Sequence, residues 1–156
     1  AAGAIDSTNI IDLGVDDGIP TSAGGGGARD IGTGDNPALE LLVQAATAFV
    51  GGTNVTVALQ GAPDNGSGLP GSYTTMWTSS AIVTANLEQG QQLANVTVPL
   101  PVPGQVLPRF LKMVYTTVGD FTAGTVTAAI VLDRFDQVRG TDGQLSGYPA
   151  GLTVAN

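Results

Sequence analysis

The residues of this chain that could carry out acid–base chemistry are carboxylates, because the sequence contains no histidine and no cysteine. The usual catalytic triad and thiol nucleophiles are therefore excluded. Six of the aspartates fall in predicted turns: Asp16, Asp17, Asp35, Asp64, Asp120 and Asp142. Two carboxylates roughly 5–9.5 Å apart can hydrolyse a glycosidic bond, yet aspartate beside glycine is also common turn chemistry. The turn interpretation is favoured, and a carboxylate hydrolase stays as an alternative.

The same acidic loops could offer oxygen ligands to calcium. No segment has the D-x-D-x-D-G spacing followed by glutamate at the twelfth position, so no metal is expected. The glycine run Gly24–Gly27 resembles a phosphate-binding loop only in composition. It leads to Ala28, Arg29 and Asp30, without the lysine that would reach a phosphate. No cofactor is expected either.

Four aromatic residues could form a sugar-binding platform: Tyr73, Trp77, Tyr115 and Tyr148. Scattered aromatics are more often core or edge packing, which is the favoured interpretation. Tyr148 stands apart, because it precedes Pro149 in a polar stretch where a lone aromatic side chain could anchor a neighbouring subunit.

The composition is that of one folded domain over residues 1–156. Hydrophobic residues make up 42% and charged residues 12%, about half the usual charged share. The net charge is −8, and the five basic residues do not cluster as nucleic-acid binding requires: Arg29, Arg109, Lys112, Arg134 and Arg139. No apolar run is long enough for a membrane helix. Neither nucleic acid nor a membrane is an expected partner.

The elements that must position these residues are strands. In Thr53–Gln60 the apolar residues Val55, Val57 and Leu59 alternate with polar ones, as in a half-buried strand. Further strands are predicted at Thr8–Leu13, Tyr73–Trp77, Ser80–Thr84, Leu93–Val98 and Thr125–Leu132. The pattern predicts an all-β fold: a jelly-roll-like β-sandwich of about eight short strands with long Gly- and Pro-rich loops, or a small barrel.

The segment Ala38–Val50 is ambiguous, since Pro37 could begin a helix there. Shifted by 72 residues it aligns without a gap on Leu111–Phe121, and Phe49 and Gly52 then fall on Phe121 and Gly124. The second copy is rich in β-branched residues and holds a Gly-Asp turn, as in a hairpin. We expect the same role for both copies and predict two hairpins.

Two segments lack any strand period. Residues 14–37 hold eight glycines and are expected to be an exposed insertion, and residues 136–156 an extended C-terminal tail. The candidate interface residues come from these segments and from the chain just before the tail: Arg29, Asp30, Arg134, Arg139 and Tyr148.

Several strings, in order, resemble the capsid cement (decoration) proteins of short-tailed bacteriophages. They are Ser7–Gly14, Ala28–Gly32, Arg109–Tyr115, Phe121–Ala128 and Ile130–Asp133. The resemblance implies a jelly roll, homotrimers at three-fold positions on the outer capsid surface, and no enzymatic activity. Less sequence precedes the first string than in similar proteins, Val15–Gly27 looks inserted, and the tail after Asp133 is distinctive.

The resulting hypothesis is a structural virion protein that binds the major capsid protein at the outer surface of an assembled capsid and stabilises the shell. A carbohydrate- or receptor-binding β module of a viral surface structure is the alternative from another functional class.

Overall fold

The computed structural model describes residues 2–14, 39–99 and 107–131. Within these ranges the chain forms strands joined by turns and a single 3-10 segment. The strands are β1 (Gly3–Asp6), β2 (Ile11–Asp12), β3 (Glu40–Gly51), β4 (Asn54–Ala62), β5 (Thr74–Thr78), β6 (Ile82–Val83), β7 (Gln92–Thr97), β8 (Phe110–Val118) and β9 (Phe121–Val131), and the 3-10 segment is η1 (Thr84–Asn86).

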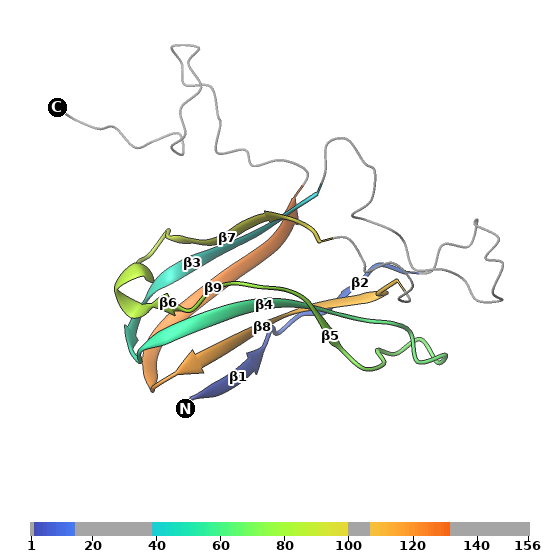
Figure 1. The fold of residues 1–156 in the computed structure, drawn as a ribbon, viewed down its shortest axis with the longest axis horizontal. Coiled ribbons are helices and arrows are strands. Elements are labelled where there is room, and N and C mark those ends of the chain that lie inside the picture. Colours follow the sequence, from blue (N-terminus) through green and yellow to red (C-terminus); the bar gives the residue numbers. More distant parts are fainter. Residues whose placement is uncertain (1, 15–38, 100–106, 132–156) are drawn as a thin grey trace, which may run out of the picture.

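The strands form two antiparallel sheets, one above the other in Figure 1. The first sheet has the order β1-β8-β4-β5, with β2 paired to β8 and β6 paired to β4. The second has the order β7-β3-β9. The prediction of an all-β, sandwich-like fold is confirmed.

The core lies between the sheets and follows the alternation of side chains along each strand. The predicted inward residues of β4, Val55, Val57 and Leu59, are buried, and β3 contributes Leu41 and Val43 from the opposite sheet. Burying one such side chain stabilises the fold by about 1.5–3 kcal/mol. The alternation of apolar with polar residues along β4 therefore specifies which face of the strand turns inward.

Two tight turns carry the chain from one sheet to the other. The turn at Gly52 and Thr53 leads from β3 into β4, and the turn at Gly119 and Asp120 leads from β8 into β9. Backbone hydrogen bonds continue through the corner: Gly52 N–H donates to the Asp120 carbonyl (2.8 Å) and Thr53 N–H to the Val118 carbonyl (2.7 Å). One long antiparallel ribbon, bent at this corner, thus supplies β8 and β4, the central pair of the first sheet, and β3 and β9 of the second.

The prediction of two hairpins was wrong. Residues 40–50 belong to the single strand β3, and β8 and β9 flank a Gly-Asp turn but lie in different sheets. The Gly-Asp turn joins β8 and β9 as a hairpin turn would, but these two strands do not pair with each other. Strand β9 pairs with β3, and β8 pairs with β4. The expectation that both copies play the same role was also wrong, because residues 40–50 stay within the second sheet while residues 111–121 cross from the first sheet to the second.

The N-terminal prediction was partly wrong. Residues 8–13 contain only the short strand β2, and the longer pairing with β8 lies earlier, at β1. All four residues of β1 are exposed, so no apolar period marks the strand in the sequence. The candidate interface residues Arg29, Asp30, Arg134, Arg139 and Tyr148 lie outside the described residues, as do positions 15–37 of the predicted insertion and the tail 136–156.

Candidate functional site

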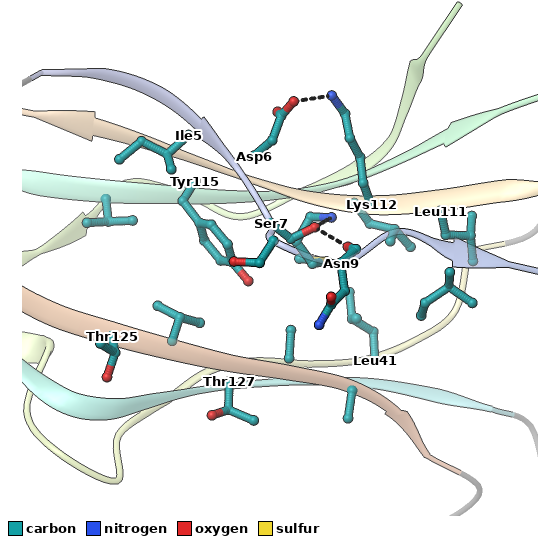
Figure 2. A pocket seen from close by; sticks show the side chains of 18 of the residues that line it. Ile5, Asp6, Ser7, Asn9, Leu41, Leu111, Lys112, Tyr115, Thr125 and Thr127 are labelled. Carbon is teal, nitrogen blue, oxygen red and sulfur yellow. Dashed lines mark hydrogen bonds and ion pairs between the residues drawn. The ribbon is translucent and has the colours of Figure 1, made fainter. Parts of the chain in front are cut away.

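A groove of about 590 Å³ opens between the β1–β2 edge of the first sheet and β9 of the second (Figure 2). Its floor is apolar and includes Leu41, Leu59 and Leu111 from the core. Exposed Ile5 and Ile11 line it from the N-terminal segment. The groove is therefore an open, mostly apolar channel along one side of the sandwich.

The N-terminal segment is held on β8 by main-chain pairing, and Ser7 bridges the break between β1 and β2. The Ser7 N–H donates to the Met113 carbonyl (2.8 Å), and the Met113 N–H donates to Ser7 Oγ (3.2 Å). The Ser7 hydroxyl in turn donates to the Asn9 carbonyl (2.7 Å). The Ser7 hydroxyl thus takes the place of a backbone carbonyl as acceptor for Met113 N–H, at the point where the β1–β8 ladder ends. The N-terminal segment therefore stays beside β8 after β1.

The ionisable side chains around this groove are unsuited to proton transfer. They are Asp6, Lys112 and Tyr115. The Asp6 carboxylate pairs with Lys112 Nζ at 2.7 Å on the face of the sheet away from the groove (Figure 2). Burial raises the pKa of Tyr115, so its phenol stays protonated at neutral pH. The arrangement favours binding of an extended apolar segment over acid–base chemistry.

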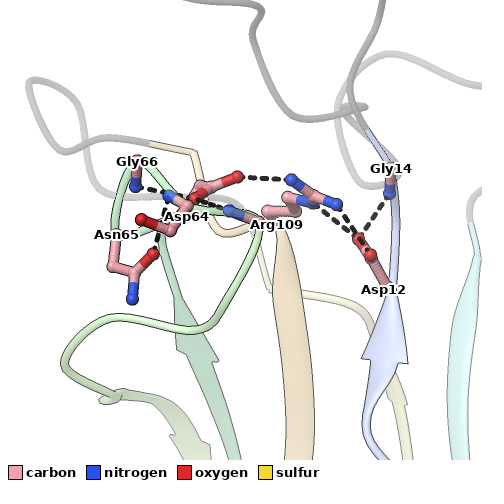
Figure 3. A network of polar contacts seen from close by, with 8 residues as sticks. Asp12, Gly14, Asp64, Asn65, Gly66 and Arg109 are labelled. Atoms are coloured by element: carbon pink, nitrogen blue, oxygen red, sulfur yellow. Dashed lines mark hydrogen bonds and ion pairs between the residues drawn. The ribbon is translucent and has the colours of Figure 1, made fainter.

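A second site, which is polar, centres on Arg109 just before β8 (Figure 3). Its guanidinium binds Asp12 in a bidentate pair, with Nε 2.8 Å from Oδ1 and Nη2 2.9 Å from Oδ2, while Nη1 pairs with Asp64. Planar bidentate pairs of this kind are the stronger class of ion pair. Arg109 thus ties β2 and the loop after β4 to the start of β8.

Hydrogen bonding sets the ionisation of this cluster. The Arg109 side chain and the Gly14 N–H lower the pKa of Asp12. Desolvation alone would raise the pKa of Asp64, but the N–H groups of Gly66 and Gly68, together with Arg109, bring it below its usual value. The hydrogen bonds that Arg109 donates to Asp12 raise the pKa of Arg109, which stays charged.

Asp12 and Asp64 therefore do not have the ionisation that a glycosidase pair needs. A general acid of that class requires a raised pKa, whereas both carboxylates here have lowered values. Asp64 also accepts hydrogen bonds from Gly66 (2.7 Å) and Gly68 (3.0 Å), as its turn prediction implies. The cluster acts as a structural clamp at the end of the first sheet. The sequence did not predict this cluster, although Arg109 begins the segment Arg109–Tyr115 that resembles the cement proteins.

The sugar-binding platform, the less favoured alternative for these aromatics, is not assembled by those that the structure describes. Trp77 lies opposite Leu59 and packs against the core, and Tyr115 lines the groove. The Tyr73 ring lies against Lys112, with Nζ 4.3 Å from the ring centroid. The Lys112 side chain points away from the groove that Tyr115 lines (Figure 2). The three rings therefore do not share one surface, and Tyr148 lies outside the described residues.

Among the described residues, no group of three or more acidic side chains could hold a metal ion. No helix in those ranges is long and apolar enough to span a membrane.

Comparison with known proteins gives one family match. The model of the family described as Bbp16 matches residues 1–130, which include every described strand of both sheets except the last residue of β9. No curated protein matches the chain.

Proposed function

The chain belongs to the Bbp16 family, whose name indicates a Bordetella phage protein, and we propose that it is a structural virion protein that binds the outer surface of an assembled bacteriophage capsid as a cement protein. The family match over residues 1–130 carries the proposal. Its partners would be the major capsid protein and further copies of itself, in a homotrimer without enzymatic activity.

The physical properties of the described body support this role. The bent ribbon and the Arg109 clamp link distant parts of the chain to one another, as an external support for a shell requires. The low charged fraction, 12%, leaves neutral surface for contacts between proteins, and interfaces are depleted of charge at their centres. The candidate contact residues remain Arg29, Asp30, Arg134, Arg139 and Tyr148.

The mechanism would be stabilisation by selective binding. A protein that binds the assembled lattice, and not the free subunits, shifts the equilibrium toward the lattice. The gain is roughly 2.7 kcal/mol per site at a free concentration a hundredfold above the dissociation constant. The stabilising free energies of the many copies on one shell add together, so modest affinity at each site is sufficient to stabilise the shell.

The test compares binding with mechanical effect. Purified protein is added to capsids that lack decoration, and co-sedimentation and the temperature of DNA release are measured. We expect saturable co-sedimentation, an increase in release temperature, and no binding to unassembled capsid protein. Failure to sediment with capsids, together with binding of sugars that changes the fluorescence of Trp77, would overturn the proposal in favour of a carbohydrate-binding module.

A further inference from the structure

The turn between β4 and β5 contains an asparagine followed by a glycine, Asn65 and Gly66. In such a pair the backbone nitrogen of the second residue can reach the side-chain carbonyl carbon of the first, because glycine has no side chain in the way. Asn65 is the one of the seven asparagines that glycine follows. Those that precede proline or a branched aliphatic residue are Asn9, Asn36, Asn54, Asn86 and Asn95.

The nitrogen that would attack is already hydrogen-bonded to a carboxylate. The Gly66 N–H donates to Asp64 Oδ1 at 2.7 Å (Figure 3). A general base takes a proton across roughly 2.6–3.2 Å, so Asp64 lies where a base for this nitrogen must stand. The pKa of Asp64 is below its usual value. The carboxylate is therefore ionised at neutral pH and free to accept a proton.

The carbonyl that would be attacked is hydrogen-bonded at its oxygen. The Ser67 N–H donates to Asn65 Oδ1 at 2.9 Å. A donor roughly 2.7–3.1 Å from an oxygen that becomes negative stabilises the tetrahedral intermediate of acyl transfer. The Asn65 N–H donates to the Leu69 carbonyl (2.9 Å), which holds the turn in this shape. The turn thus places a base on the nucleophile and a donor on the electrophile.

Solvent reaches the site. Residues 65–69 are exposed, and a β-carbon added at Gly66 would meet open space. Asn9, Asn86 and Asn95 are exposed as well. Exposure alone therefore does not distinguish Asn65 from them, whereas the following glycine and the two hydrogen bonds do.

We propose that Asn65 is a site of self-modification, in which the Gly66 nitrogen attacks the side-chain carbonyl carbon of Asn65. The new C–N bond closes a five-membered succinimide ring, and the bond from that carbon to Nδ2 breaks. The Gly66 N–H proton passes to the Asp64 carboxylate and leaves with the Nδ2 group as ammonia. Water then opens the ring at either carbonyl, which leaves aspartate or isoaspartate at position 65.

The products alter the turn that the Arg109 clamp holds. Either product adds a negative charge next to Asp64, and isoaspartate also lengthens the backbone of the turn by one carbon. The hydrogen bonds of Asn65 with Ser67 and Leu69 then lose their geometry. We expect protein modified at this position to melt at a lower temperature than fresh protein. The reaction belongs to the free chain and does not depend on capsid binding.

Peptide mapping of the full chain tests the proposal. Purified protein is incubated at neutral and at mildly alkaline pH and then digested with pepsin in acid, where the reaction is slow. We expect the peptide containing Asn65 to be converted to the acid several-fold faster than those containing Asn9, Asn86 and Asn95. The product should contain both isoaspartate and aspartate, separated by chromatography. Conversion no faster than in these controls, or aspartate without isoaspartate, would overturn the proposal, since direct hydrolysis of the amide gives aspartate alone.

Two variants separate the action of Asp64 from that of the dipeptide. Asp64→Asn keeps an acceptor oxygen for the Gly66 N–H but cannot take up its proton, so conversion should be several-fold slower. Arg109→Gln removes the clamp and keeps the carboxylate, so conversion should not slow. An unchanged rate in Asp64→Asn, or equal slowing in both variants, would show that the carboxylate is not the base and would overturn the proposed route.

Discussion

The rings of Phe49 and Phe121 meet edge to face at the corner of the bent ribbon, with centroids 5.4 Å apart and an interplanar angle of 87°. Each ring also covers a glycine of the other segment: Phe121 lies on Gly52, and Phe49 lies on Gly124. The 72-residue shift that relates Phe49 to Phe121 also relates Gly52 to Gly124. The weak internal repeat therefore corresponds to a reciprocal contact between β3 with its following turn and β9, at the corner of the ribbon.

Gly52→Ala should destabilise the fold through this contact. A β-carbon at this position would overlap the Phe121 ring, and the backbone φ of +59° is itself unfavourable for alanine. Displacing a packed side chain costs about 1–3 kcal/mol. We expect a clear fall in the free energy of unfolding measured with urea.

Gly66→Ala is the matched control for that measurement. Its φ is +88°, but a β-carbon there would meet open space, so it carries the conformational cost without the steric one. Gly52→Ala should lose distinctly more stability than Gly66→Ala. Equal losses would show that the Phe121 contact contributes nothing.

The sequence predicted those parts of the fold that depend on local pattern. The burial of Val55, Val57 and Leu59 follows from alternation, which holds along β4 as far as Gly61. The assignment of β3 and β9 to one sheet depends instead on pairing between residues far apart in the chain, and no local pattern encodes that choice. The Arg109 clamp was missed for the same reason, because Asp12 is 97 positions away and Asp64 is 45.

Arg109→Gln tests the clamp. The substitution removes both ion pairs and leaves two carboxylates near one another at the end of the first sheet, where β2 and the loop after β4 lose their common partner. We expect a melting temperature lowered by several degrees. Lys112→Gln is the control, because it breaks one pair, with exposed Asp6, and should change the melting temperature less. A larger loss of melting temperature in Lys112→Gln than in Arg109→Gln would show that Arg109 does not join these segments.

The contribution of the clamp should depend on pH. The pKa of Asp12 and that of Asp64 lie below the usual 3.8 in the folded protein, so their stabilisation is complete above that value. It is lost as the pH falls through the folded-state pKa values, where both carboxylates become protonated. Urea unfolding at pH 7 and pH 3 should therefore show a large difference between the native protein and Arg109→Gln at pH 7 and a smaller one at pH 3. A difference that grew toward acid would contradict the sign of these shifts.

Self-association into trimers is expected for the purified protein. The reasons are the family resemblance and a charged fraction of 12%, which leaves neutral surface for subunit contacts. Multi-angle light scattering at micromolar concentration should give three times the chain mass of 15.6 kDa. A monomer mass across that range would contradict the prediction.

Removing residues 136–156 should separate folding from attachment. The segment follows the last strand of the second sheet, so the β body should keep its circular dichroism spectrum and its melting temperature. The segment is polar, lacks a strand period and contains Arg139 and Tyr148, so we expect its contacts to be with capsids or neighbouring subunits. Capsids carrying the truncated protein should release DNA at a lower temperature than capsids carrying the full chain at equal occupancy, and Tyr148→Ala should reproduce part of that loss. Equal release temperatures would show that the segment does not fasten the protein to the shell.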